Sequence, residues 1–431
     1  MSHASAEYRR RMEAQDRASL GDHQLARFND LLAAILPTNS FYAAKLANCP
    51  RQIESLDQLA EFPLTGKEEL ICEGIGRPTP ANLTWPLEQY VRYHQTSGTR
   101  GRPLPVYDTD ADWRWWVDCW QYVLDAANVE SADRALLAFS FGPFIGFWSA
   151  HDALIERGSL SIPGGGMNSM ARLDLLQRTG ATALFCTPTY ALHLAEVAEE
   201  HKINLAHFDV NKLVVAGEPG GSMPATRERI ESTWNARLTD HSGASEVGPW
   251  GYGDREQRGL HVLESEFIAE FLAVDTGEPA GEGELAHLVL TSLGRHGMPV
   301  IRYRTGDLVR PYWPKEGPNR FVMLEGGVLG RADDMMVVRG VNIFPSSIEQ
   351  ILHGFPEIVE FRLTARKRGE MDELVVEVED RLQAPERIAD ELRLRLGLKV
   401  DVQLAAPLSL PRFEGKGERF VDLRTGGEEE S

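Results

Sequence analysis

Residues 159–216 read SLSIPGGGMNSMARLDLLQRTGATALFCTPTYALHLAEVAEEHKINLAHFDVNKLVVA, and this stretch decides the fold. Its short apolar runs, typical of strands, are Ser159–Pro163, Ala183–Thr187 and Lys212–Ala216. Between them, Met170–Arg178 and Tyr190–Glu200 have helical spacing, and Gly180 stands where a helix C-terminal glycine belongs. Strands that alternate with helices in this way predict right-handed crossovers and a mostly parallel sheet. Ligands of such sheets bind at the carboxyl ends of the strands.

The flanking sequence predicts helices before this stretch and a second sheet after it. Residues up to about Thr96 have the pattern of helices and loops, to which we assign no chemistry. From Glu264 to Arg310, short strands such as Glu284–Leu290 and Pro299–Arg304 alternate with glycine-rich turns. This pattern favours an antiparallel or barrel-like subdomain.

After Gly330 the pattern is that of a small α+β unit. A capping box of Ser346 and Glu349 predicts a helix start. The apolar positions that mark helix faces and strands are Ile348, Ile351, Leu352 and Phe355, then Leu374, Val376 and Val378, then Ile388, Leu392 and Leu396, and finally Val400–Leu404. The predicted fold class is therefore α/β. A large domain (1–330) has doubly wound mixed or parallel sheets and a β-rich subdomain, and a small mobile α+β domain (331–431) follows.

The charge balance excludes some classes of partner. The 431 residues include 64 acidic and 45 basic side chains, which gives a formal net charge of −19. Nucleic acids and anionic membranes bind clustered Lys and Arg, so we expect neither as a partner. A nucleotide needs only a local group of donors, and the net charge does not exclude it.

The cysteines and the apolar runs predict a cytoplasmic protein. The cysteines, Cys49, Cys72, Cys119 and Cys186, are few and widely spaced, which favours neither a disulfide framework nor a zinc cluster. The arginine-rich first residues lack the apolar stretch of a secretion signal. The most apolar run, 135–150, is interrupted by Gly142-Pro143 and falls short of a membrane span.

The strongest local signal is Thr96-Ser97-Gly98-Thr99-Arg100-Gly101-Arg102-Pro103. Its glycines allow close backbone approach, its hydroxyls donate hydrogen bonds and its arginines bring positive charge, a combination that polyphosphates require. The Gly-Lys-Ser/Thr ending of a Walker loop is absent. A surface turn rich in Ser and Gly is the alternative.

Two further segments combine glycines with polar side chains. Gly217-Glu218-Pro219-Gly220 comes after Lys212–Ala216, where backbone groups can hold a flat base or simply form a strand-to-helix loop. Asp240-His241-Ser242-Gly243-Ala244-Ser245-Glu246 places a carboxylate beside hydroxyls, which suits Mg²⁺ next to a phosphate. The alternative for Glu246 is an exposed carboxylate at a helix start.

Three later segments carry polar residues on turns. Tyr303-Arg304-Thr305-Gly306-Asp307 puts Asp307 at a strand end, where its carboxylate can accept hydrogen bonds from two ribose hydroxyls. Gly330-Arg331-Ala332-Asp333-Asp334 falls on the predicted domain boundary. Pro411-Arg412-Phe413-Glu414-Gly415-Lys416-Gly417 carries Lys416 between two glycines, on a loop that can travel. A lone lysine of this kind is otherwise part of the solvated surface.

These six segments occur in the order found in the acyl-adenylate-forming superfamily. From about Thr96 to Val421 the sequence resembles its phenylacetate–CoA ligase family. The segments most similar to this branch are Gly217-Glu218-Pro219, Ser245-Glu246 and Val341-Asn342-Ile343-Phe344-Pro345. The resemblance implies an ATP-dependent acid–thiol ligase.

The resemblance also implies which residues bind ATP. Thr96 to Arg102 hold the β- and γ-phosphates, with Arg at 100 and 102 where the family usually has Thr and Lys. Gly217, Glu218 and Pro219 border the adenine, Ser245 approaches the α-phosphate and Glu246 binds Mg²⁺. Asp307 takes the ribose hydroxyls, and Arg331 reaches the ribose or the phosphate.

Two implied roles lie in the C-terminal part of the chain. Lys416 matches the lysine that bridges the acid carboxylate and the α-phosphate while the mixed anhydride forms. In the family the small domain rotates between the two half-reactions, and Asp333 is the expected hinge.

The acid is expected to bind beside the sheet. Aromatic residues cluster near Gly142 and Gly146, namely Phe139, Phe141, Phe144, Phe147 and Trp148. Such a cluster suits a flat apolar substrate or plain core packing. The residues expected to line the acid are Phe141, Phe147, Ala216, Gly217, His241 and Gly243. Trp113, Trp116 and Trp120 share a helix face, for which core packing is expected.

Two positions depart from the family pattern. The family often has Tyr where Ser242 stands, next to the adenine, and an apolar residue where His241 stands. The histidine predicts a hydroxyl or amino substituent on the acid, with His241 as its partner.

The sequence therefore predicts an enzyme that converts an aromatic carboxylic acid to acyl-AMP, releases pyrophosphate and transfers the acyl group to coenzyme A. ATP, Mg²⁺ and CoA are the expected cofactors. A carrier-protein phosphopantetheine or an amine is the alternative acceptor. A non-catalytic nucleotide sensor is the alternative from another class, and Lys416, Glu246 and Asp307 argue against it. The choice of acid and the oligomeric state, with a homodimer as one option, stay open.

Overall fold

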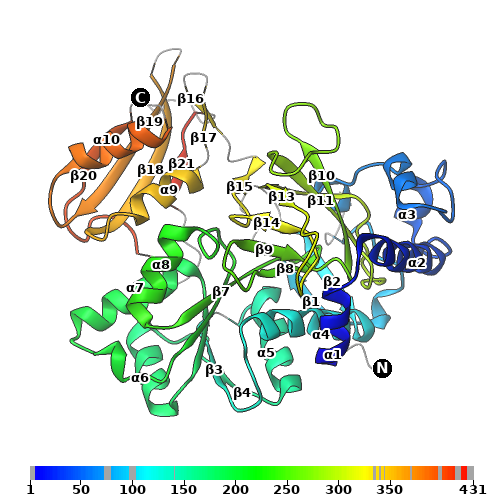
Figure 1. Ribbon diagram of the computed structural model, residues 1–431, viewed down its shortest axis with the longest axis horizontal. Coiled ribbons are helices and arrows are strands. Elements are labelled where there is room, and N and C mark those ends of the chain that lie inside the picture. Colours follow the sequence, from blue (N-terminus) through cyan, green and yellow to red (C-terminus); the bar gives the residue numbers. More distant parts are fainter. Residues whose placement is uncertain are drawn as a thin grey trace.

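The structure is a computed structural model that describes residues 5–71, 79–96, 103–139, 141–332, 336–338, 341–343, 345–368, 371–396, 400–412 and 419–424. It confirms the predicted α/β fold, with a small unit beside a large one (Figure 1). The α-helices of the described chain are α1 (Ala6–Glu13), α2 (Arg17–Ile35), α3 (Ser40–Lys45), α4 (Asp110–Ala126), α5 (Ile145–Arg157), α6 (Ser169–Thr179), α7 (Pro188–Glu200), α8 (Pro224–Trp234), α9 (Pro345–His353) and α10 (Pro385–Leu396). Short 3-10 helices span Leu56–Glu61, Glu68–Leu70, Leu87–Gln89 and Leu205–His207.

A large mixed sheet forms the centre of the large unit. In the described part of the chain its strands are β3 (Arg134–Leu137), β4 (Leu160–Pro163), β5 (Ala183–Cys186), β6 (Lys212–Ala216), β7 (Arg237–Ala244), β8 (Gly248–Gly253), β9 (Gly259–Val262), β13 (Pro311–Tyr312) and β14 (Met323–Glu325). They lie in the order β13-β14-β9-β8-β7-β6-β5-β3-β4. Pairing is parallel from β4 to β7 and antiparallel from β8 onward. Helices α4 and α5 lie on one side of the parallel strands and α6, α7 and α8 on the other (Figure 1).

The crossover helices begin and end at side chains suited to those positions. The Asn168 side chain accepts a hydrogen bond from the Ala171 amide at the start of α6, and Thr187 caps α7 in the same way. Gly180 ends α6 with φ at +58°, which confirms the predicted C-terminal glycine. Strand β6 covers the predicted residues Lys212–Ala216.

A second sheet, antiparallel as predicted, has the order β10-β11-β12-β15. Its strands are β10 (Phe267–Ala273), β11 (Ala286–Ser292), β12 (Tyr303–Val309) and β15 (Gly330–Arg331). The strand predicted at Pro299–Arg304 starts only at Tyr303, because Arg302 has a left-handed φ of +47° that interrupts the extended chain. The prediction that Asp307 lies at a strand end is therefore wrong, since it lies inside β12. The boundary predicted between residues 330 and 331 falls inside β15.

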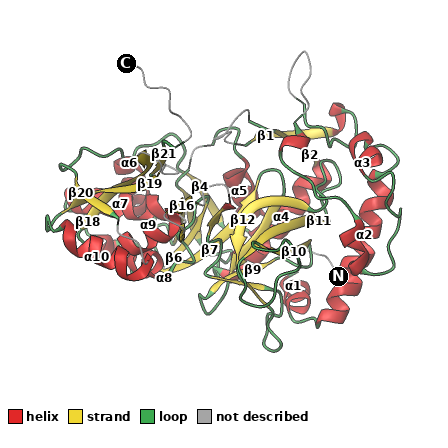
Figure 2. Cartoon of the chain, turned by 90° about the horizontal axis from the view of Figure 1, so that it is seen from above, coloured by secondary structure: helices red, strands yellow, loops and turns green. Residues whose placement is uncertain are grey.

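A hairpin of β1 (Tyr90–Gln95) and β2 (Pro105–Thr109) lies along one edge of the large unit (Figure 2). The sequence did not predict β1. Its apolar side chains Val91 and Tyr93 are 61% and 48% exposed, so they do not form the core-facing stripe by which a strand is recognised.

The small unit has its own sheet and core. Its strands β18 (Ile358–Arg368), β19 (Met371–Asp380), β20 (Asp401–Leu404) and β21 (Phe420–Asp422) lie in the order β20-β19-β18-β21. Another hairpin pairs β16 (Met336–Val338) with β17 (Val341–Ile343). The predicted apolar faces of α9 and α10 are buried, for example at Ile348 and Leu392. The capping box predicted at Ser346 is wrong, because α9 already begins at Pro345, a residue suited to the first helical position.

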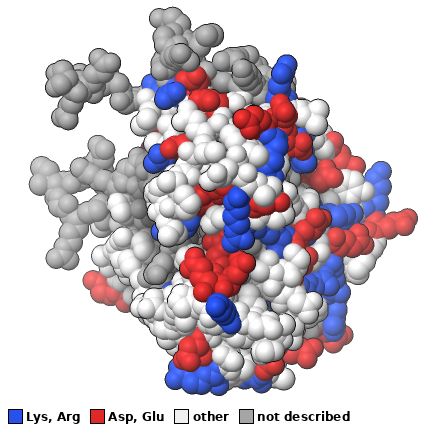
Figure 3. Space-filling model, turned by 90° about the vertical axis from the view of Figure 1, so that its left-hand side faces the viewer, with Lys and Arg blue, Asp and Glu red and all other residues white. Residues whose placement is uncertain are grey.

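The described chain shows the core and surface of an ordinary globular protein. Trp113, Trp116 and Trp120 are 6%, 2% and 2% exposed, which confirms their predicted core packing. Cys49, Cys119 and Cys186 are free thiols. No helix among the described residues is both long and apolar enough to cross a membrane. On the face in Figure 3, basic and acidic side chains are interspersed.

Candidate active site

The turns at the carboxyl ends of β6 and β7 lie side by side. Ala216, the last residue of β6, pairs with His241 of β7, so the turn at 217–220 stands next to the segment 240–246. Gly217 and Gly220 have φ values of +94° and +139°, which favour glycine. The Glu218 Oε1 accepts a hydrogen bond of 2.8 Å from the Thr189 amide at the start of α7. This is the predicted place for a ligand of the sheet.

Glu246 is a buried carboxylate in the turn between β7 and β8. It is 7% exposed, so the alternative of an exposed carboxylate at a helix start is wrong. The Tyr303 hydroxyl donates to Oε1 at 2.9 Å, and Lys67 Nζ lies 3.3 Å from the same oxygen. Burial, and then the charge of Glu246, raise the pKa of Tyr303, which keeps its hydroxyl a donor. No hydrogen bond to the second oxygen, Oε2, is found among the described residues.

This donor set suits a magnesium ion that is shared with a phosphate. The described residues contain no group of three or more His, Cys, Asp or Glu side chains that could hold a metal. Mg²⁺ is often held by one or two carboxylates together with substrate phosphates. One buried carboxylate with a single oxygen already engaged fits that arrangement.

Asp307 and Arg331 face each other across β12 and β15. Arg331 Nη1 donates to Asp307 Oδ1 at 2.9 Å and to the Thr305 carbonyl at 2.8 Å. Gly306 precedes Asp307 and has a φ of +80°, which favours glycine. A Cβ added at this position would lie only 2.7 Å from Arg331 Nη2. Burial raises the pKa of Asp307, and the Arg331 charge opposes this rise. A carboxylate and a guanidinium therefore lie side by side on the paired strands β12 and β15.

His241 is a neutral histidine with a fixed tautomer. Its Nδ1 lies 2.7 Å from the Gly251 carbonyl, which can only accept, so Nδ1 carries the hydrogen. Burial lowers the pKa of His241 to about 4. Its ring packs against the ring of Trp120, with 4.3 Å between the two centroids. Its other nitrogen, Nε2, lies near Gly243, because a Cβ added to this glycine would be 3.4 Å from it. Nε2 is therefore a hydrogen-bond acceptor next to Gly243.

The predicted aromatic cluster is formed only in part. Phe141 and Trp148 meet edge to face at 4.9 Å, and Trp148 Nε1 donates to the Gly142 carbonyl at 3.0 Å. Phe139 is buried, whereas Phe144 is 41% exposed because it caps α5 from outside the core. The Phe147 side chain lies outside the described residues.

Several predicted site residues lie outside the described residues: Ser97, Gly98, Thr99, Arg100, Gly101, Arg102, Asp333 and Lys416. The chain on either side of residues 97–102 is described. Thr96 and Leu104 exchange two hydrogen bonds, from the Thr96 amide to the Leu104 carbonyl at 3.0 Å and from the Leu104 amide to Thr96 Oγ1 at 2.9 Å. The residues on either side of this segment, Thr96 and Leu104, are therefore held together next to the hairpin β1–β2.

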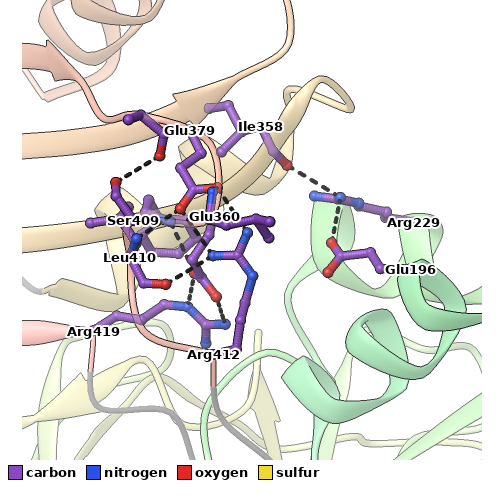
Figure 4. A network of polar contacts seen from close by, with 12 residues as sticks. Glu196, Arg229, Ile358, Glu360, Glu379, Ser409, Leu410, Arg412 and Arg419 are labelled. Atoms are coloured by element: carbon purple, nitrogen blue, oxygen red, sulfur yellow. Dashed lines mark hydrogen bonds and ion pairs between the residues drawn. The ribbon is translucent and has the colours of Figure 1, made fainter. Parts of the chain in front are cut away.

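The residues that flank 413–418 are bound to the central hairpin of the small unit (Figure 4). Arg412 donates through Nη1 and Nη2 to Glu379, at 3.1 and 2.8 Å. Arg419 donates through Nε and Nη2 to Glu360, at 2.5 and 2.9 Å. The amides of Leu408 and Leu410 also donate to Glu379.

Few polar contacts join the small unit to the helices α7 and α8. Arg229 of α8 donates to the Ile358 carbonyl at 3.3 Å and lies 4.0 Å from Glu196 of α7 (Figure 4). Arg381 pairs with Glu199 at 3.2 Å. A cavity of about 20 Å³ between the units is large enough for a single water.

Comparisons with known proteins identify the family of this chain. The family described as AMP-binding enzyme C-terminal domain matches residues 340–424. The phenylacetate-coenzyme A ligase of Thermus thermophilus is 30% identical over 449 aligned residues, which cover 97% of this chain and 99% of that protein. The chain belongs to the phenylacetate–CoA ligase family. It is an AMP-forming acid–CoA ligase that uses ATP and CoA and passes through an acyl-adenylate.

Two crystal structures of one relative match this chain with different scores. 2-Hydroxyisobutyryl-CoA ligase in the postadenylation state, in complex with R3-HIB-AMP, matches with a TM-score of 0.89 at 26% identity, over 96% of this chain and 91% of that one. The same enzyme with 2-HIB-AMP and CoA, in the thioesterification state, gives 0.73 at 27% identity, over 98% and 94%. Identity and coverage hardly differ, so this chain as a whole is more similar to the postadenylation structure than to the thioesterification structure.

Two residues that contact the candidate site were not predicted from the sequence. Lys67 lies in the N-terminal part of the chain, to which no chemistry was assigned, and only the folded chain brings it to Glu246. Arg295 is fully buried behind Ser245. Its sequence signal was a lone arginine between apolar runs, within Leu293-Gly294-Arg295-His296-Gly297-Met298, which resembles many surface turns.

Proposed function

We propose that this ligase activates an aromatic carboxylic acid as acyl-AMP at the carboxyl ends of β6 and β7 and then transfers the acyl group to CoA. The observation that carries the proposal is Glu246. It is a buried carboxylate, held on one oxygen by Tyr303 and Lys67, with the other oxygen available beside Ser245. The acid is proposed to be phenylacetate-like or a hydroxy- or amino-substituted benzoate.

The ATP would lie across the turns that the fold brings together. Thr96 and the segment up to Arg102 are proposed for the β- and γ-phosphates, and Ser245 for the α-phosphate. Glu246 is the proposed Mg²⁺ ligand. The backbone of Gly217, Glu218 and Pro219 is proposed to border the adenine, with Ser242 beside it. Asp307 is proposed to accept the ribose hydroxyls, with Arg331 as the nearby cation.

The chemical problem is that a carboxylate must attack an already negative α-phosphate. When Mg²⁺ is bound, it neutralises phosphate charge. Arg331, and the proposed Lys416, would lower the remaining repulsion, and the fixed positions of Ser245 and Glu246 would hold the phosphate in place. The acid oxygen then bonds to the α-phosphorus, and pyrophosphate leaves.

The acid is proposed to lie between the aromatic pair at Phe141 and Trp148 and the strand residues Ala216, His241 and Gly243. Since His241 Nε2 is an acceptor at neutral pH, a hydroxyl or amino group on the acid is the substituent that it would bind. A carrier protein as acceptor, a homodimer, a cytoplasmic location, the Asp333 hinge and the domain limits stay predictions from the sequence.

An exchange assay tests this proposal. The full chain is incubated with MgATP, labelled pyrophosphate and a panel of benzoates, phenylacetates and their hydroxy- and amino-substituted relatives. We expect acid-dependent exchange, strongest with an aromatic acid that carries a donor group. Exchange with unsubstituted phenylacetate far above every substituted acid would contradict the role of His241. No exchange with any acid would favour a nucleotide sensor.

A further inference from the structure

A fully buried ion pair lies behind the proposed phosphate site. Arg295 and Asp108 are both 0% exposed. Arg295 Nε donates to Asp108 Oδ1 at 2.8 Å, and Nη2 lies 2.7 Å from the same oxygen. Asp108 belongs to β2, which follows the segment 97–102, and Arg295 belongs to the turn between β11 and β12.

The same guanidinium also contacts the segment that carries Glu246. Arg295 Nη1 donates to the Ser245 carbonyl at 2.8 Å. The guanidinium carbon of Arg295 lies 5.5 Å from the ring centroid of Trp116 in α4. Arg295 thus joins β2 and the helix α4 that follows it directly to the turn between β7 and β8, which lies more than a hundred residues later in the sequence.

Stability alone gives little reason for this pair. Removing two charges from water costs several kcal/mol per ion in real proteins, and well-packed apolar residues often replace such pairs without loss of stability. Asp108 Oδ2 has no hydrogen-bond partner in the described chain, so the desolvation of the carboxylate is only partly compensated. A rigid guanidinium fork, by contrast, fixes the relative positions of the groups it joins.

We propose that Arg295 is a positioning residue: it fixes the turn that carries Ser245 and Glu246 relative to β2 and α4, so that the proposed Mg²⁺ ligand Glu246 is held in place for ATP. This inference rests on the proposed function of Glu246. A lysine cannot replace the arginine, because a single ammonium group does not reproduce a planar fork directed at both Asp108 and the Ser245 carbonyl.

Arg9 offers a matched control. It is 3% exposed, and its Nε and Nη2 donate to Asp125 at 2.6 and 3.0 Å. Its guanidinium carbon lies 5.9 Å from the ring centroid of Tyr122, also in α4. Arg9→Met therefore removes a buried, bidentate, ring-stacked arginine that the structure does not connect to Ser245.

The test compares the wild type with Arg295→Met, Arg295→Lys and Arg9→Met in the full chain. The first assay is acid-dependent ATP–pyrophosphate exchange, and the second is thioester formation from supplied acyl-AMP and CoA. A third readout does not need catalysis: the affinity for Mn²⁺ and ATP together, followed through the EPR signal of free Mn²⁺.

For Arg295→Met we expect exchange to fall about a hundredfold, the effect of a misplacement of about 1 Å. Thioester formation should stay within about threefold, and Mn²⁺–ATP should bind at least about tenfold more weakly. Arg295→Lys should also lower exchange more than thioester formation, but by a smaller factor. Arg9→Met should change the melting temperature but not the ratio of the two half-reactions.

Equal losses in both half-reactions of both Arg295 variants, or unchanged Mn²⁺–ATP affinity, would overturn the inference and leave Arg295 a purely structural residue. If Arg295→Met does not fold, Arg295→Lys decides the question through the ratio of its exchange rate to its rate of thioester formation. A wild type that binds Mn²⁺–ATP but exchanges no pyrophosphate would contradict the proposed function instead, while the EPR affinities still decide the role of Arg295.

Discussion

At the scale of single residues, the site is determined by what surrounds each carboxylate. Glu246 receives a hydroxyl and an ammonium group on one oxygen, from residues 57 and 179 positions away in the sequence. The sequence made Glu246 and Asp307 candidates because they stand in recognisable segments. It could not identify Lys67 or Arg295, because their roles depend on contacts that exist only in the folded chain.

The Tyr303 hydroxyl should orient Glu246 for the metal. Tyr303→Phe removes the hydrogen bond of 2.9 Å, and we expect a higher Mg²⁺ requirement and exchange lower by roughly one decade, the worth of a hydrogen bond to a charged group. The measurement is exchange rate against Mg²⁺ concentration. Tyr122→Phe, which removes another buried hydroxyl, 3.1 Å from Ser265 Oγ, is the control. Equal Mg²⁺ curves for both variants would contradict this role.

His241 should make stability depend on pH in a predictable direction. Burial lowers its pKa from 6.5 to about 4, so between these values the unfolded chain binds more protons than the folded one. The stability that neutral His241 provides is thus present above pH 6.5 and lost as pH falls toward 4.

The matched measurement is urea unfolding of the wild type and His241→Gln from pH 7.5 to 4.5. The stability of the wild type relative to the variant should fall with decreasing pH, by at most roughly 3 kcal/mol at about 1.4 kcal/mol per pKa unit. The other buried histidines contribute equally to the unfolding free energy of both proteins, so their contributions cancel in this difference. A difference that does not change with pH would show that His241 is not held neutral by the fold.

At the scale of elements, hydrophobic pattern and turn residues predicted most of the parallel core. Strand β6 and the end of α6 at Gly180 match the sequence, because buried runs and left-handed glycines are local signals. Strand β1 was missed because its apolar side chains face outward, and β12 was misplaced because nothing local reveals the left-handed Arg302. That displacement moved Asp307 from a strand end to a strand interior.

The hairpin β18–β19 should hold both ends of the segment that carries Lys416. Glu379 accepts from Arg412 and from two backbone amides, so Glu379→Gln should weaken this attachment. We expect exchange to fall about tenfold or more, with thioester formation from acyl-AMP nearly unchanged.

Glu377→Gln is the control for this prediction. Glu377 lies on the same face of β19 and pairs with Arg362 inside the hairpin, at 2.6 Å. Its loss should leave both half-reactions close to wild type. If the two variants lowered exchange equally, the attachment of residues 413–418 through Arg412 would have no special role.

At the scale of the whole molecule, the sequence predicted the family and the two-unit plan but not how the units are placed. That placement depends on a few contacts between the units, among them Arg229 with the Ile358 carbonyl, and single positions in a sequence do not reveal them. The net charge of −19 also proved consistent with an ATP enzyme. A nucleotide needs only a local group of donors, and on the face in Figure 3 basic and acidic side chains are interspersed.

The small unit should serve the first half-reaction through Lys416. Lys416→Ala should lower exchange by about two to three decades, as the loss of one charged stabiliser does elsewhere. Thioester formation from supplied acyl-AMP should continue. Lys315→Ala removes an exposed lysine of the large unit and is the control. Near-normal exchange in Lys416→Ala would move the catalytic lysine to another position.

The most direct test of the central claim is product analysis of one turnover by mass spectrometry. The full chain, MgATP and the best acid of the panel are mixed first without CoA and then with it. We predict enzyme-bound acyl-AMP of the aromatic acid and pyrophosphate before CoA is added, and the acyl-CoA thioester and AMP in equal amounts afterwards. Formation of ADP and phosphate, or acyl-AMP that persists in the presence of CoA, would contradict an adenylate-forming aryl-acid–CoA ligase.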